Sequence, residues 1–124
     1  MTDLTGAGLE PDAGAPGSVN LPSAAAELLE LARTSRAGRA GRTLTPGAGA
    51  ALKQTLMALV AGQSLADHDT PTAATLQVLV GAVRLTAGGT ETLELYAGDH
   101  APVPPVRHGL DAIDDAVVLI SVVQ

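Results

Sequence analysis

The spacing of apolar and polar positions changes near residue 42, and the two patterns predict different structures. Before this point, apolar residues recur at the three-to-four spacing of an amphipathic helix. They are Ala25, Leu28, Leu29 and Ala32. We predict an N-terminal helix over residues 23–38, with Ser23 as its N-cap and Gly38 at its end.

After residue 42, the chain consists of short segments rich in Leu, Val and Thr, separated by turn residues. This pattern is typical of an all-β sandwich or barrel. The predicted strands are residues 43–45, 52–60, 75–80, 83–86, 92–96 and 116–123. We expect Gly81 to form a tight hairpin turn between two of them, and residues 87–90 to form another turn.

Residues 98–108 predict a strand, a corner and a second strand. A Gly-Asp turn is followed by a short apolar run and by three prolines within four residues, and the stretch ends at His108. Proline removes a backbone donor and fixes its own backbone, so a helix is disfavoured here.

The first 22 residues predict a disordered tail. They are rich in glycine, proline and acidic residues, and their apolar residues show no period. The predicted organisation is therefore a tail over 1–22, a helix over 23–38 and one β-domain over 39–124.

Composition narrows the functional classes. The chain has no cysteine, so it can form neither disulfides nor thiolate metal sites, and this fits a cytoplasmic location. No apolar run approaches the roughly 18 residues of a membrane span, so we expect no membrane partner. The net charge of −6 and a single aromatic residue, Tyr96, argue against nucleic-acid binding.

Four arginines at a spacing of three could nevertheless form a basic patch: Arg33, Arg36, Arg39 and Arg42. Glycines 38 and 41 interrupt any helix that would align them. We interpret these arginines as solvated positions at a helix end and on an edge strand.

Two segments carry a family resemblance. Residues 62–68, with the strand that ends at Gly81, and residues 98–108 resemble the two signature motifs of the cupin superfamily. The resemblance covers about residues 52–123. It implies an all-β, cupin-type β-barrel or double-stranded jelly roll, with one N-terminal helix and a ligand or metal at the barrel mouth.

The motifs depart from the family pattern at the metal ligands. Metal-binding cupins use two histidines and a glutamate from the first motif and one histidine from the second. His68 and His108 correspond to the first and last of these, but Thr70 stands at the second histidine and Ala74 at the glutamate. The second motif is also one residue short and lacks its usual glycine.

The resemblance and these departures lead to a first hypothesis, a cupin-like small-molecule-binding or sensing module without the full metal site. Its ligand-binding residues would be His68, Thr70, Gln77 and His108. An imidazole would donate to an acidic or carbonyl-bearing small molecule. A purely structural role remains open, because buried histidines commonly serve as hydrogen-bonded core residues.

The alternative hypothesis is a metal-dependent cupin enzyme of the oxygenase or isomerase type. His68, His100 and His108 would then form a rearranged metal site. No serine elbow, phosphate-binding glycine loop or paired-carboxylate motif identifies another chemistry, so enzymatic activity stays open. We expect no cofactor under the first hypothesis and a divalent metal ion under the second.

We expect a homodimer. A small, aromatic-poor barrel with an almost wholly apolar final strand over residues 116–123 has limited surface to bury alone.

Overall fold

The structure is a computed structural model that describes residues 17–44, 49–68 and 73–124, with only the backbone of residues 67 and 68. In this part of the chain there are one helix and nine strands. They are α1 (Leu21–Thr34), β1 (Arg39–Thr43), β2 (Leu52–Leu59), β3 (Ser64–His68), β4 (Ala74–Val80), β5 (Ala82–Ala87), β6 (Glu91–Tyr96), β7 (His100–Pro102), β8 (His108–Ala112) and β9 (Ala116–Val123).

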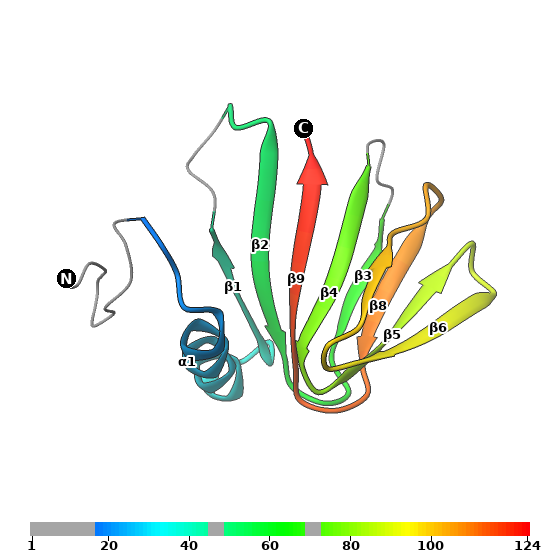
Figure 1. The fold of residues 1–124 in the computed structure, drawn as a ribbon. Coiled ribbons are helices and arrows are strands. Elements are labelled where there is room, and N and C mark those ends of the chain that lie inside the picture. Colours follow the sequence, from blue (N-terminus) through cyan, green and yellow to red (C-terminus); the bar gives the residue numbers. More distant parts are fainter. Residues whose placement is uncertain (1–16, 45–48, 69–72) are drawn as a thin grey trace.

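The strands form two antiparallel sheets. Sheet A has the order β1-β2-β9-β4-β7, and sheet B has the order β3-β8-β5-β6. A core of apolar residues from both sheets fills the space between them, including Leu59 and Val118 of sheet A and Val83 and Leu110 of sheet B. The sheets converge at one end and spread apart at the other (Figure 1). We call the faces that meet in this core the inner faces.

The predicted all-β architecture with one helix is confirmed. The strand predicted over 116–123 is observed at the same bounds, and the strand predicted over 52–60 ends one residue earlier. The segment 98–108 contains a strand, a corner and the start of a second strand, as expected. In place of the strand predicted over 43–45, the structure has β1, which ends at residue 43. Residue 45 lies outside the described residues.

The hairpin predicted around Gly81 is wrong. The two strands that flank Gly81 do not pair: β4 pairs with β7 and β9, whereas β5 pairs with β6 and β8. Gly81 has a φ of +76°, and a side chain there would collide with the carbonyl oxygen of Asp115. The residue is therefore a corner where the chain passes from sheet A to sheet B. A short apolar run on each side of a glycine cannot distinguish such a corner from a hairpin.

Helix α1 begins earlier than predicted. Asn20 is the N-cap, because its side-chain oxygen accepts a hydrogen bond of 2.9 Å from the backbone N–H of Ser23. Pro22 lies in the first turn, where its missing N–H costs nothing. The helix ends at Thr34, before the predicted Gly38, and most of the predicted tail, residues 1–16, lies outside the described residues.

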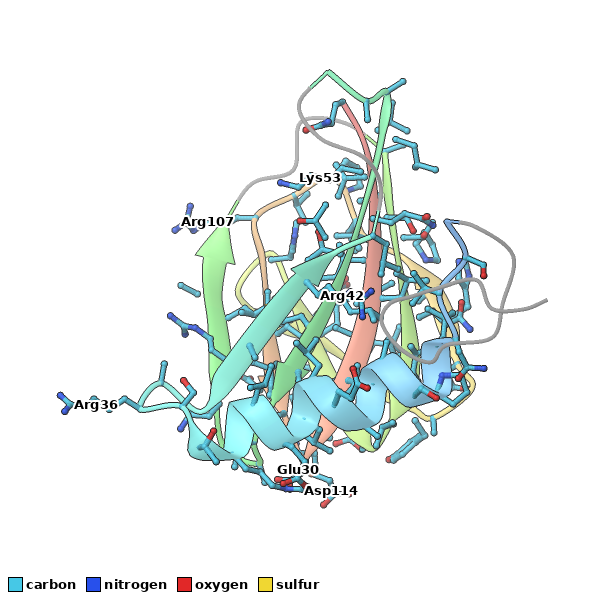
Figure 2. The ribbon with its side chains drawn as sticks, turned by 90° about the vertical axis from the view of Figure 1, so that its left-hand side faces the viewer. Glu30, Arg36, Arg42, Lys53, Arg107 and Asp114 are labelled. Carbon is cyan, nitrogen blue, oxygen red and sulfur yellow. The ribbon has the colours of Figure 1, made fainter. Side chains whose placement is uncertain are left out.

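The helix covers the outer face of sheet A. It lies across that face in Figure 2. Its buried residues, Ala24, Ala25, Leu28, Leu29 and Ala32, pack in one cluster with residues of β2 and β9 that include Leu56 and Val117. Strand β9 is therefore covered on both faces, which explains its nearly continuous apolar sequence.

Two of the four arginines spaced three apart lie on an edge strand. Arg39 and Arg42 lie on β1, which is an edge strand of sheet A, as the solvated interpretation of the arginines requires. In the described part of the chain, no helix has the length and apolar character needed to cross a membrane.

Candidate functional site

A small apolar pocket lies between the two sheets. Its volume is about 60 Å³. The lining residues come from β3, β4, β5, β8 and β9 and from the segment after β7: they are Leu65, Ala74, Leu76, Leu85, Val103, His108, Leu110, Ile120 and Val122. Of these, His108 alone is polar. The pocket can therefore hold a small apolar group and offer it one polar contact.

His108 is the first residue of β8 and is buried, with 6% of its surface exposed. Its Nδ1 lies 2.9 Å from the carbonyl oxygen of Val106. Because a carbonyl oxygen only accepts, Nδ1 carries the hydrogen and donates it. The short loop before β8 thus fixes the orientation of the ring.

His68 is the backbone partner of His108. Strands β3 and β8 are antiparallel neighbours, and their register places His68 opposite His108, after an irregularity that follows Leu65. The fold thus brings together the backbones of two histidines that lie 40 positions apart in the sequence. The side chain of His68 and the whole of Thr70 lie outside the described residues.

Gln77 and His100 lie on the other face of sheet A. They oppose each other across β4 and β7. Gln77 alternates with Leu76 and Val78, which are buried in the inner core, and His100 is exposed beside the buried Ala101. Successive side chains of a strand point to opposite faces, so Gln77 and His100 face away from the pocket and from His108.

Ala74 occupies the pocket wall. It stands where the resemblance places a glutamate ligand, it is 9% exposed, and it lines the pocket together with His108. At this point of the wall the chain has a methyl group and no carboxylate. Among the residues that the structure describes, no three histidine, aspartate or glutamate side chains come together as a metal site would require. The described residues therefore do not fit the full ligand set of a metal-binding cupin.

Most of the pocket wall was not predicted as a site from the sequence. Ile120 and Val122 line it, whereas Leu119 on the same strand packs against the helix-side cluster. Because both faces of β9 are apolar, its alternation does not show which residues face the pocket. Val103 belongs to the proline-rich corner, where no period exists to interpret.

A network of charged and polar side chains on β5 and β6 lies outside the pocket. On the outer face, the Glu94 carboxylate accepts hydrogen bonds from the Tyr96 hydroxyl at 2.8 Å and from Arg84 at 3.2 Å. These two donors lower the pKa of Glu94, the Tyr96 hydroxyl more than Arg84, and the carboxylate raises the pKa of Tyr96. The network is exposed to solvent.

The chain is similar to known proteins in its three-dimensional structure. No protein-family model matches the chain, and no curated protein matches its sequence. A conserved protein of unknown function from Streptococcus pyogenes superposes with a TM-score of 0.64 and 26% identity, over 73% of this chain and 77% of that one. A cupin superfamily protein from Desulfitobacterium hafniense gives a TM-score of 0.62 and 15% identity, over 68% and 76% of the two chains.

An enzyme is also among the similar structures. The DMSP lyase DddQ from Ruegeria pomeroyi has a TM-score of 0.59 and 21% identity, over 69% of this chain and 47% of the lyase. At these identities, the likeness to the Desulfitobacterium protein and to the lyase describes the fold and does not extend to an activity.

Proposed function

Since this chain is a small cupin-domain protein by its fold, we propose that it is a cytoplasmic small-molecule-binding or sensing module. The proposed ligand has a small apolar body that enters the pocket between the sheets and one polar group that meets His108. His68 and Thr70 remain proposed neighbours of the ligand. Gln77 and His100 are left out, because their strand positions face the other side of sheet A.

The observation that carries this proposal is a buried imidazole in the wall of an otherwise apolar pocket. The hydrogen bond from Nδ1 to the Val106 carbonyl oxygen holds the ring of His108 at the pocket wall. A purely structural histidine would be expected in a closely packed environment, since protein interiors leave few voids. The space beside His108 supports a binding role.

The proposal is tested by thermal-shift screening of a library of small metabolites against the full chain. We expect at least one compound to raise Tm, because a ligand that binds only the folded state stabilises it. The variant Ala74→Val adds two methyl groups to the pocket wall and should abolish the shift. Its control is Ala73→Val, the same change at an exposed neighbour. If no compound raises Tm, or if Ala74→Val responds like Ala73→Val, the pocket is not a binding site.

A metal-dependent enzyme of the oxygenase or isomerase type is the second candidate. The backbone pairing of His68 with His108 favours it, since two neighbouring histidines could begin a metal site with a divalent ion. His100, the third predicted ligand, lies on the far face of sheet A.

Elemental analysis of protein purified without a histidine tag separates the two candidates. For a binding module, we expect well under one metal ion per chain, with no change in the double variant His68→Ala/His108→Ala. One metal ion per chain that disappears in this variant would replace the binding module with the enzyme.

The expected homodimer is part of the proposal. Leu52 and Val123, which are register partners on sheet A, are 45% and 48% exposed. A second copy could cover them, because isologous dimers bury the same patch of both subunits. Sedimentation velocity at tens of micromolar should show a dimer. A monomer at that concentration would contradict this part of the proposal.

A further inference from the structure

Next to the apolar wall of the pocket, strand β2 carries polar residues. Strand β2 pairs with β9 over its whole length, with Lys53 opposite Val122 and Thr55 opposite Ile120. Val122 and Ile120 both line the pocket, whereas Lys53 and Thr55 do not. A polar border therefore lies next to the apolar wall, one strand away from it.

Lys53 and Thr55 lie on the inner face of sheet A. Met57, two positions after Thr55, packs against the core between the sheets, opposite Val118. Alternate residues of a strand share a face, so all three positions of β2 face the side on which the pocket lies. Directly opposed residues have Cβ atoms about 4.5–5.5 Å apart, so the Lys53 side chain starts beside Val122. Its four methylene groups are long enough to bring the ammonium toward the pocket.

The ammonium of Lys53 has no competing partner in the described part of the chain, where no hydrogen bond or ion pair involves it. By contrast, Arg33 and Arg84 both hold carboxylates. Lys53 lies with Arg107 at the end of the molecule away from α1 (Figure 2).

An acidic residue, Glu91, lies on the side of the pocket that sheet B forms. Glu91 is the first residue of β6, the edge strand of sheet B, and it opposes Ala87, which is itself paired with His108. Lys53 thus carries a positive charge on the β2 side of the pocket, and Glu91 carries a negative charge on the β6 side. An anionic group on a bound molecule is attracted toward Lys53 and repelled by Glu91.

From this placement we infer that the ligand is a small aliphatic carboxylate. Its hydrocarbon part lies against the apolar wall of the pocket, and its carboxylate lies on the side of His108 and pairs with Lys53. The inference rests on the proposed function, which gives the ligand an apolar body and one polar group that meets His108, and adds that this group is a carboxylate and that Lys53 selects it.

The test uses a matched series of probes with the full-length chain. Straight-chain carboxylates from propanoate to hexanoate are compared with the primary amides of the same length, by NMR titration or calorimetry. We expect the carboxylates to bind about three- to tenfold more tightly than the amides at low salt, and the preference to shrink as salt is added, as for an exposed ion pair.

Lys53→Met removes the charge while keeping a long apolar side chain, and should make carboxylate and amide affinities equal. Arg42→Met is the matched control, since it removes the same charge from the outer face of sheet A, where Arg42 opposes Leu56 of the helix-side cluster. This control should keep the preference for carboxylates.

The outcomes separate the inference from the proposed function. Equal binding of carboxylates and amides to the wild type would overturn the inference and leave the pocket as a binding site. A preference that survives Lys53→Met would also overturn it. If neither series perturbs the residues that line the pocket, and the metabolite library also fails, the proposed function itself is wrong.

Discussion

At the scale of single residues, the pocket wall combines one imidazole with apolar side chains. Ala74 and His108 both line it, the first with a methyl group and the second with an imidazole whose Nδ1 is held by Val106. A carboxylate at Ala74 would place a charge among Leu76, Ile120 and Val122, and its burial would require a partner. The described wall is therefore better suited to an apolar group than to a cation.

The corner between the two sheets depends on the backbone conformation of Gly81. Its φ is +76°, and a Cβ would collide with the Asp115 carbonyl oxygen. We expect Gly81→Ala to lower the free energy of unfolding by about 3 kcal/mol, since left-handed strain of roughly 1–2 kcal/mol adds to a displaced backbone. Urea unfolding measures this value.

Gly89→Ala is the matched control for Gly81→Ala. Gly89 has a similar φ of +82°, but no atom lies within 4 Å of the position of a Cβ. Gly89→Ala should introduce only the backbone strain, and it should lower the free energy of unfolding by about 1 kcal/mol. Equal losses in the two variants would show that the collision at the corner is relieved at no cost.

At the scale of elements, helix α1 contributes by covering sheet A. Its apolar stripe could be predicted from its spacing, and the buried residues are those of the stripe with Ala24 added. Its start could not, because Asn20 and Ser23 are both suitable N-caps and Pro22 is compatible with a helix that begins before or at it. The side-chain hydrogen bond of Asn20 decides between them.

Two leucines of α1 test how strongly the helix depends on sheet A. Leu28 is 4% exposed and Leu31 is 60% exposed. Leu28→Ala should lower the free energy of unfolding by about 2–4 kcal/mol, because it leaves a cavity between helix and sheet. Leu31→Ala, the same change on the solvated face, should change it by no more than about 0.5 kcal/mol. Urea unfolding of both variants checks this, and equal effects would mean that the helix does not pack on the sheet.

At the scale of the whole molecule, Asp115 connects three distant segments. It lies just before β9, its carboxylate accepts the N–H of Ala61 at 2.9 Å after β2, and Arg33 of α1 pairs with it at 3.1 Å. The hydrogen bond from Ala61 lowers the pKa of Asp115 most, and the hydrogen bond from Arg33 lowers it further. The stabilisation therefore exists while the carboxylate is charged.

This connection predicts an acid dependence of stability. Because the pKa of Asp115 is lower in the folded than in the unfolded chain, its contribution is present above the unfolded value, near 3.9, and is lost as pH falls through the folded value. We expect Asp115→Asn to lower the free energy of unfolding at pH 7 and to reduce its decline below about pH 5. Urea unfolding at a series of pH values measures both effects.

The control for Asp115→Asn is Asp114→Asn, which removes the same charge one residue earlier without removing these contacts. It should keep the acid dependence of the wild type. If both variants show the wild-type decline, the contacts of Asp115 do not contribute to stability.

The sequence by itself determined most of the strands, the helical stripe and the histidine at the start of β8, because each depends on a local period or a local turn. It misplaced β1 and did not predict β3. It did not determine which strands pair around Gly81, or which face of β9 meets the pocket, since both faces of that strand are apolar. Only the tertiary structure placed Gln77 and His100 away from His108 and set Lys53 beside the pocket. The reason is physical: pairing and facing depend on contacts between residues far apart in the chain, and the local pattern is the same for either arrangement.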